Sequence, residues 1–124
     1  MKKPEPKLTD AELEIMHVVW ELGQVTVRQV HQHLNRRRPL AYTTVMTMMG
    51  ILEDKGHLTR IKQGRAYLYR PVRPKSQVIA GMVDDFVGKV FEGSARPLVL
   101  SLVKDRKLSK KDIEEIARLI EEAE

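Results

Sequence analysis

The sequence contains no cysteine, and none of its apolar runs approaches the ~20 residues that a transmembrane helix needs. Without cysteine, disulfide bonds and thiolate metal sites are excluded. The first seven residues hold three lysines and two prolines but no apolar segment of the kind found in a secretory signal peptide. We therefore expect a cytoplasmic protein that does not insert into a membrane.

The motifs of common active sites are also missing. There is no glycine-rich phosphate-binding loop, no nucleophile elbow and no zincin motif, and the one pair of adjacent aspartates lacks the separation of a two-carboxylate site. His31 and His33 would point about 200° apart on a helix, so they could not bind one metal ion together. Neither His17 nor His57 has an evident second metal ligand in the sequence. We expect no cofactor, no metal ion and no catalysis.

The net charge of +5 is unevenly distributed along the chain. Residues 1–73 hold 13 Lys/Arg and 7 Asp/Glu, whereas residues 74–124 hold 9 and 10. Between residues 24 and 73, ten Lys/Arg face only two acids. A one-sided positive field suits a polyanion such as a nucleic acid, because each neutralised phosphate releases condensed counterions. The alternative is ordinary surface charge that keeps the protein in solution.

Two capping boxes predict the starts of helices. Thr9 and Glu12 form the first box, and its helix should end at Gly23. Thr26 and Gln29 form the second, and its helix should end before three arginines and a proline. Apolar residues recur at helical spacing in both segments, so each helix should bury one face. The residues expected to point inward are Leu13, Ile15, Met16, Val18, Val19, Trp20, Leu22, Val27, Val30 and Leu34.

A third helix is predicted from about Ala41 to Lys55, closed by Gly56. Its opposite faces differ in character. The apolar face carries Ala41, Val45, Met48, Met49 and Leu52, whereas the other face carries Thr43, Met46, Thr47 and Gly50. The second set is small and uncharged, which is unusual for a surface that faces solvent. It suits close approach to base edges and thymine methyl groups in a DNA major groove.

Gly50 strengthens this interpretation. A glycine inside a helix costs up to ~1 kcal/mol relative to alanine, so its presence suggests that something approaches the backbone there. The alternative is that Gly50 allows tight packing of the helix within the protein.

Residues 58–62 and 66–70 are short β-prone runs separated by residues 63–65. They predict a β-hairpin with a basic tip that could lie along a phosphate backbone. The alternative is a hairpin that only covers the helical core. The two roles are compatible, because a hairpin can pack on the core at its base and contact DNA at its tip. The basic residues of the hairpin are Arg60, Lys62, Arg65 and Arg70.

From Lys75 onward the pattern predicts a helix with two apolar ridges, followed by two further helices. A break at residues 93–97 separates the first two helices, and Ser109 with Asp112 should cap the last. Three short helices cannot enclose this much apolar surface, so we expect a second copy to cover it in a symmetric dimer. A self-contained three-helix bundle is the alternative. The residues expected at the dimer interface are Val78, Ile79, Met82, Val83, Phe86, Val90, Leu98, Leu102, Ile113, Ile116 and Ile120.

Together these elements predict a mainly α protein. Residues 1–73 should form an N-terminal winged helix-turn-helix, with three helices and a β-hairpin wing, and residues 74–124 a C-terminal helical dimerisation domain. Two such domains on a two-fold axis would present their third helices to half-sites of a palindromic operator. We therefore expect a sequence-specific DNA-binding regulator. The alternative is a winged-helix adaptor that binds an acidic protein, and it would lack a preferred DNA sequence.

Five segments match a known pattern as a set, although none would be convincing alone. They are Leu8–Met16, Trp20, Thr26–Val30, Ala41–Thr47 and Tyr67–Tyr69. Over about residues 8 to 120 the chain resembles the penicillinase repressor (BlaI/MecI) family, which also includes copper-responsive repressors. The resemblance implies a homodimer that represses β-lactam-resistance or related operons by blocking the promoter on double-stranded DNA. The cysteine motif of the copper-responsive branch is absent, so no thiolate copper site is expected.

By position, the recognition helix of that family falls on residues 41–55 and the wing tip on residues 63–65. The resemblance therefore implies base and phosphate contacts at both places. With the outward Arg28 and Lys62, the expected DNA-binding residues are Arg28, Tyr42, Thr43, Thr44, Met46, Thr47, Lys62, Gln63, Gly64 and Arg65.

The resemblance also implies a mode of induction. In the better-known relatives a membrane sensor detects the antibiotic, and the repressor is then cut within its dimerisation domain. The matching segment here is residues 98–102, and the scissile pair would be Ser101–Leu102. Relatives that are cut carry Asn-Phe at that pair, so this chain departs from the pattern. A membrane sensor-protease, or its effector, is the partner that such cleavage would require.

Overall fold

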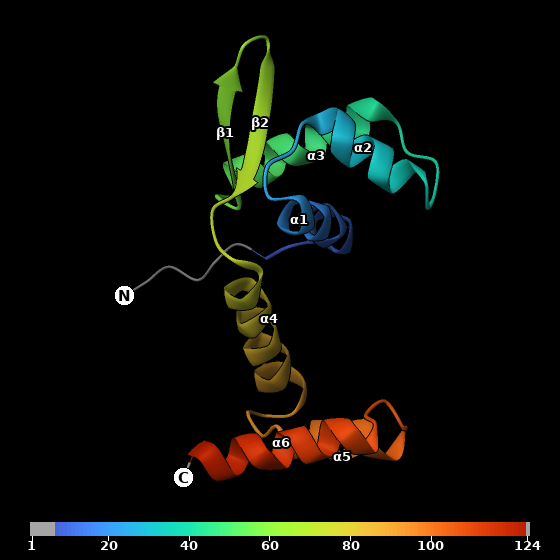
Figure 1. Cartoon of the computed structure of the whole chain (residues 1–124), viewed down its shortest axis with the longest axis vertical. Coiled ribbons are helices and arrows are strands. Elements are labelled where there is room, and N and C mark those ends of the chain that lie inside the picture. The colour runs from blue at the N-terminus through green and yellow to red at the C-terminus, as the bar shows by residue number, and fades with distance from the viewer. Residues whose placement is uncertain (1–6, 124) are drawn as a thin grey trace. The chain divides into compact units, whose positions relative to one another are not determined.

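The computed structural model describes residues 7–123, which form six α-helices and one antiparallel β-hairpin (Figure 1). The mainly α fold with a single hairpin is as the sequence predicts. The lysine- and proline-containing start of the chain, apart from Lys7, lies outside the described residues. In chain order the elements are α1 (Asp10–Leu22), α2 (Val27–Asn35), α3 (Tyr42–Asp54), β1 (Leu58–Gln63), β2 (Ala66–Pro71), α4 (Lys75–Val90), α5 (Arg96–Lys104) and α6 (Lys110–Ala123).

The chain divides into two compact units, Met1–Val78 and Ile79–Glu124. The division falls within α4, five residues beyond the predicted boundary at 73/74, because the first turn of α4 belongs with the N-terminal unit. Val78 in that turn is already buried within a single chain, at 3% exposed, which leaves little of it for a second copy to cover. The domain boundary in functional terms stays a prediction.

Both predicted capping boxes of the N-terminal unit are confirmed. The amide of Thr9 donates to Glu12 Oε1 at 2.8 Å, and the amide of Glu12 donates to Thr9 Oγ1 at 3.1 Å. Thr26 and Gln29 form the same pair of bonds at the start of α2, at 2.8 and 3.2 Å. α1 ends at Gly23, whose φ of 86° lies in the region that favours glycine. Short polar side chains thus set where the first two helices begin.

One hydrophobic core lies among α1, α2, α3 and the base of the hairpin. Most residues predicted to point inward from the three helices are buried, but Leu22 and Ala41 are exposed, which corrects that part of the prediction. Both lie at helix ends, where packing against neighbouring helices gives way to solvent. The core residues are Ile15, Met16, Val18, Val19, Val25, Val30, Leu34, Val45, Met49, Leu52, Leu58 and Tyr69.

The hairpin is tighter than the sequence predicts. Its register runs from Leu58 opposite Pro71 to Gln63 opposite Ala66, so Gln63 belongs to β1 and the loop has two residues instead of three. Gly64 takes the first loop position with φ 64°. Val25 adds a bridge that the sequence pattern did not reveal, exchanging two backbone hydrogen bonds with Tyr69 at 2.9 and 2.7 Å. This bridge ties the segment between α1 and α2 to β2.

A buried ion pair joins the start of α1 to the end of α3. Lys55 Nζ, in the C-cap residue of α3, donates to Glu12 Oε1 at 2.7 Å, and the Glu12 side chain is only 5% exposed. Burial alone would raise the pKa of Glu12, but hydrogen bonds from Lys55 and Thr9 outweigh it and hold that pKa below its ordinary value of 4.5. The carboxylate is therefore ionised at neutral pH.

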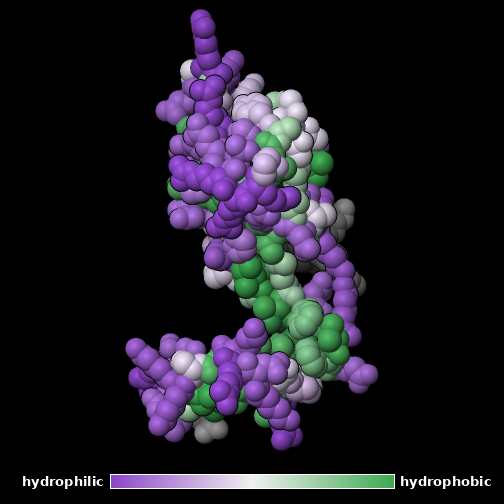
Figure 2. All heavy atoms as spheres, turned by 90° about the vertical axis from the view of Figure 1, so that its right-hand side faces the viewer, coloured by the Kyte–Doolittle hydropathy of each residue, from purple (hydrophilic) through white to green (hydrophobic). Residues whose placement is uncertain are grey.

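The C-terminal unit has a different character, because no residue between Ile79 and Ala123 is buried. Its helices lie where the sequence predicts them, and Ser109 and Asp112 exchange the expected capping bonds at 2.9 and 3.0 Å. Figure 2 shows hydrophobic side chains gathered along α4. A self-contained three-helix bundle would bury a row of side chains, so that alternative does not describe this unit.

We predict that Glu12→Gln destabilises the N-terminal unit in a pH-dependent way. Because the folded-state pKa of Glu12 lies below the unfolded value, its carboxylate adds stability above about pH 4.5, and this contribution is lost as the pH falls through the folded-state pKa. The substitution should lower the free energy of unfolding by roughly 1 to 3 kcal/mol at neutral pH and by much less near pH 3. Urea titration followed by the fluorescence of Trp20, the single tryptophan, measures both.

The matched control is Glu14→Gln on the same helix, which removes an exposed pair with Arg38 at 3.2 Å. Its cost should stay below about 1 kcal/mol. An equal loss of stability at neutral and acid pH for Glu12→Gln would contradict the role assigned to the carboxylate.

Candidate nucleic-acid interface

α3 is held in the N-terminal unit by one face and exposes the other. Val45, Met49 and Leu52 are completely buried. On the other side Met46 is 47% exposed and Thr47 is also exposed. All five residues that the resemblance assigns to contacts on this helix are exposed to solvent; they are Tyr42, Thr43, Thr44, Met46 and Thr47. The structure thus makes available the neutral surface that the sequence predicts.

The surroundings of Gly50 decide between its two interpretations. A Cβ atom built on Gly50 would meet no heavy atom within 4 Å, apart from its chain neighbours and the backbone of its own helix. Tight packing within the protein therefore does not explain this glycine, and that alternative is wrong. The open space beside Gly50 leaves room for an external group to approach the helix backbone.

The start of α3 is fixed by two side chains of α2 that the sequence analysis did not assign to the site. His31 Nε2 lies 2.7 Å from the carbonyl oxygen of Leu40, and Asn35 Oδ1 accepts a hydrogen bond of 3.1 Å from the Leu40 amide. A carbonyl can only accept, so Nε2 of His31 carries the proton. The His31 ring also meets the Tyr42 ring edge to face, with centroids 5.6 Å apart. The spacing of four residues between His31 and Asn35, which places both on one face of a helix, was the signal available in the sequence.

The end of α3 is fixed by charge. Lys55 bonds to Glu12 as described above, and Glu53 forms a salt bridge with Arg60 of β1, in which Oε2 and Nε lie 3.2 Å apart. The guanidinium of Arg60 also lies 4.3 Å from the centroid of the Tyr67 ring. A hydrogen bond with Tyr69, together with the charge of Glu53, raises the pKa of Arg60 above its ordinary value. Arg60, predicted as part of the basic wing, is therefore engaged within the protein.

Other cations have no such partner. Arg28, Lys62, Arg65 and Arg70 are exposed, and none forms an ion pair with another described residue. Side chains alternate along a strand, so Lys62 shares a face of the hairpin with Arg60, whereas Arg70 lies on the other face. Lys62 and Arg65 are thus the uncompensated charges nearest the wing tip.

Two further exposed arginines, Arg36 and Arg37, lie in the turn that leads to α3 and were not among the predicted contacts. No ion pair occupies either of them within the described part of the chain. Positive charge that is free to meet a polyanion therefore occurs before the start of α3 as well as in the hairpin that follows its end.

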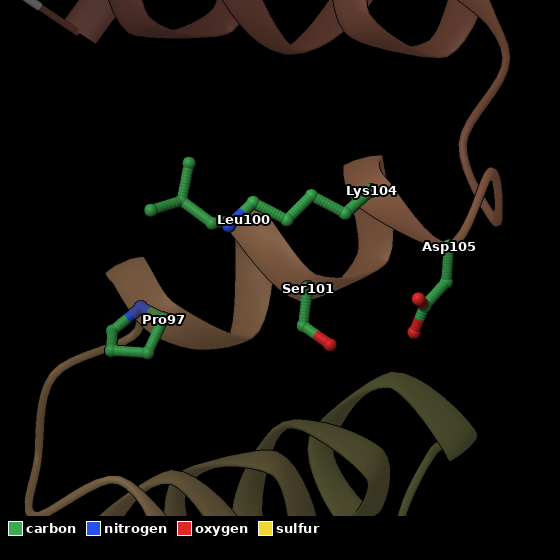
Figure 3. A pocket seen from close by; sticks show the side chains of 5 residues that line it. All are labelled: Pro97, Leu100, Ser101, Lys104 and Asp105. Atoms are coloured by element: carbon green, nitrogen blue, oxygen red, sulfur yellow. The ribbon is translucent and has the colours of Figure 1, made fainter.

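The predicted cleavage pair lies inside α5. Ser101 is exposed and Leu102 half-buried, so a protease that binds extended substrates would have to unwind the helix here. The Ser101 side chain borders a surface depression of about 390 Å³, and Figure 3 shows it pointing to the same side as Asp105. Cleavage stays a prediction. The depression is lined by Pro97, Leu100, Ser101, Lys104 and Asp105.

The residues predicted at a dimer interface are distributed over α4, α5 and α6. Phe86 is 47% exposed and contacts Phe91 edge to face, with centroids 5.7 Å apart. Val90 and Ile120 are exposed by 56% and 58%. Apart from Val78, these side chains keep much of their apolar surface in contact with water.

Two features are absent from residues 7–123. No group of three or more His, Cys, Asp or Glu side chains in this part of the chain is arranged to hold a metal ion. None of its helices combines the length and the apolar character that crossing a bilayer requires.

Comparison with known proteins identifies relatives along nearly the whole chain. The family model described as "Penicillinase repressor" matches residues 8–122. The penicillinase repressor of Bacillus licheniformis is 30% identical over 120 residues, which are 97% of this chain and 94% of the relative. The transcriptional regulator BlaI of Mycobacterium tuberculosis is 37% identical over 95 residues, 76% of this chain and 69% of the relative.

A solved structure is similar to part of the chain. It is the solution structure of the monomeric form of BlaI from Bacillus licheniformis in complex with the blaP half-operator. The match has a TM-score of 0.52 and 36% sequence identity, and it covers 61% of this chain and 92% of the other.

We predict that Gly50→Ala stabilises the folded protein but weakens its binding to duplex DNA. Alanine should raise the free energy of unfolding by up to about 1 kcal/mol, because it favours the helix and meets no neighbour within 4 Å. If duplex DNA approaches this face, the added methyl group should weaken binding at the same time. Urea titration and a gel-shift assay measure the two effects.

The control is Gly81→Ala inside α4, where the added methyl group also meets open space and should leave duplex binding unchanged. Unaltered duplex affinity of Gly50→Ala would remove Gly50 from the interface.

Proposed function

The chain belongs to the penicillinase repressor family, and on that premise we propose that it represses transcription as a homodimer bound to a palindromic operator. α3 would enter the major groove, while the wing and the residues around the start of α3 would contact the phosphate backbone. The genes under control would be those of β-lactam resistance or related operons. The protein would work in the cytoplasm and would catalyse no reaction.

The exposed face of α3 is the observation that carries this proposal. A helix that is anchored through three fully buried residues and exposes Thr43, Met46 and Thr47 presents a rigid, uncharged surface. Short hydroxyl and methyl groups of this kind can contact base edges and thymine methyl groups without the desolvation cost of a charge. The cations that have no ion-pair partner lie in neighbouring elements, where contacts to phosphates would set the orientation of the helix. A relative that is 36% identical has been solved with a half-operator, which supports the same mode of binding here.

The proposal of a dimer rests on the C-terminal unit. A folded unit without a single buried residue between Ile79 and Ala123 gains little from the hydrophobic effect, and a second copy would bury the exposed apolar side chains of α4, α5 and α6. A two-fold axis would then present two α3 helices to half-sites one helical turn apart, or a multiple of it. Pairing would also double the number of base contacts, which raises specificity.

The direct test is to incubate the purified full chain with fragments of its own genome and to sequence the fragments that it retains. We expect enrichment of a palindrome, protection of both half-sites in a footprint, and affinity for any duplex that falls steeply with salt. A protein that only binds an acidic partner protein would retain no preferred sequence. That result would replace the repressor with an adaptor.

We predict that Arg65→Ala weakens binding to all duplexes and reduces the salt dependence. Each lost phosphate contact lowers the slope of log K against log salt by about 0.9, and a dimer carries the substitution twice, so the slope should change by about two. Fluorescence anisotropy at several salt concentrations measures it. Arg60→Ala is the matched control on the same hairpin, and its effect should be smaller because Glu53 and Tyr67 already engage Arg60. An unchanged slope for Arg65→Ala would remove this residue from the phosphate contacts.

We predict that Phe86→Glu abolishes the dimer. A carboxylate in an apolar interface is costly to desolvate without a partner, so the variant should sediment as a monomer at micromolar concentration. Asp84→Ala, on the opposite side of α4, should stay dimeric. Were Phe86→Glu to remain a dimer, Phe86 would lie outside the seam between the two copies.

A further inference from the structure

We propose that His31 and Asn35 are positioning residues for sequence recognition, because they hold the backbone carbonyl and amide of Leu40, and His31 also contacts the Tyr42 ring, where α3 begins. This inference rests on the proposed function, since it concerns how the recognition helix is oriented. Neither residue was among the expected DNA contacts, and they act through the backbone and through Tyr42.

The two bonds to Leu40 act on opposite ends of one residue. His31 donates from Nε2 to the Leu40 carbonyl at 2.7 Å, while Asn35 accepts from the Leu40 amide at 3.1 Å. Because both side chains come from α2, which is fixed in the core by Val30 and Leu34, Leu40 is held relative to the body of the unit. Together they form a clamp, and we use that name for this pair of contacts.

The clamp matters because α3 has no cap of its own. Its N-cap residue is Ala41, whose side chain cannot accept a hydrogen bond, and no side-chain capping bond is present. α1 and α2 each begin with a complete capping box instead. The three successive arginines before α3 are exposed, whereas Leu40 packs against the core, so that packing and the clamp together define where the helix starts. Fraying or a shift of this first turn would move the side chains of residues 42–44.

His31 also sets the orientation of Tyr42. The two rings meet edge to face with an interplanar angle of 78°, and Tyr42 is 43% exposed, so its ring contacts His31 and is still accessible to a ligand. A tyrosine held in this way loses little conformational freedom on binding. Such pre-organisation should favour the operator over other sequences and leave general attraction to phosphates unaffected.

The experiment separates the two functions of His31. Glutamine places an amide nitrogen close to the position of Nε2, so His31→Gln retains a donor for Leu40 but removes the ring. His31→Phe retains a ring beside Tyr42 but removes the donor. Asn35→Ala removes the second half of the clamp. His33→Gln is the matched control, because His33 lies on the same helix, is also half-buried, and its side chain makes no hydrogen bond or ring contact with a described residue.

Affinity is measured for the operator selected from the genome and for a scrambled duplex of the same length and composition. We expect each of the three variants to reduce the ratio of the two affinities by about 3- to 10-fold, the effect of one hydrogen bond or one aromatic contact. The affinity for the scrambled duplex and its salt slope should not change. In a Tyr42→Ala background, His31→Gln should have no further effect, because the His31 ring acts on recognition through the Tyr42 ring, which that background lacks.

Three results would overturn the inference. In the first, the His31 and Asn35 variants have the same affinity ratio as His33→Gln. In the second, they lose affinity for both duplexes equally, as a simple loss of folded protein would produce. In the third, His31→Gln keeps its full effect in the Tyr42→Ala background. Trp20 fluorescence checks that each variant is folded under the binding conditions. A wild-type protein that does not prefer the operator at all would instead refute the proposed function, and this inference with it.

Discussion

The burial of one face of α3 is the constraint on which the rest of the N-terminal unit depends. Val45, Met49 and Leu52 are wholly removed from water against α1, α2 and the base of the hairpin. Each such side chain contributes roughly 1.5 to 3 kcal/mol, so the helix cannot rotate about its axis without a large loss of stability. The opposite face is thereby fixed in its direction, and its small side chains, with an open space beside Gly50, acquire a defined position.

Polar contacts then fix the two ends of α3, which the hydrophobic core alone would leave loosely defined. At the C-terminal end, Lys55 bonds to the buried carboxylate of Glu12, and Glu53 forms a salt bridge with Arg60. At the N-terminal end, His31 and Asn35 hold Leu40. Hydrophobic burial is nearly insensitive to direction, whereas hydrogen bonds depend on distance and angle. The combination yields a helix whose position and register are both set.

The C-terminal unit shows the opposite balance. α6 begins with a pair of capping bonds and both α5 and α6 are amphipathic, yet the helices of this unit leave most of their apolar side chains in contact with water. Local structure is therefore complete in this unit while its packing is not. If a second copy supplies the missing contacts, as proposed, the folding of this unit and the pairing of two DNA-binding units become one event, and the occupancy of an operator depends on protein concentration.

The sequence by itself determined the features that depend on neighbours along the chain. The capping boxes of Thr9 and Thr26, the periodicity of α3 and the basic hairpin are local patterns, and all are present in the structure. Only the tertiary structure decided which charges remain available, because the pairing of Arg60 with Glu53 and the bridge from Val25 to Tyr69 join segments whose approach no local pattern encodes. The clamp on Leu40 belongs to the same class, since it needs the turn to fold back on α2. Local hydrogen-bonding and apolar periodicity can be derived from residue spacing, whereas contacts across the core depend on how the helices pack.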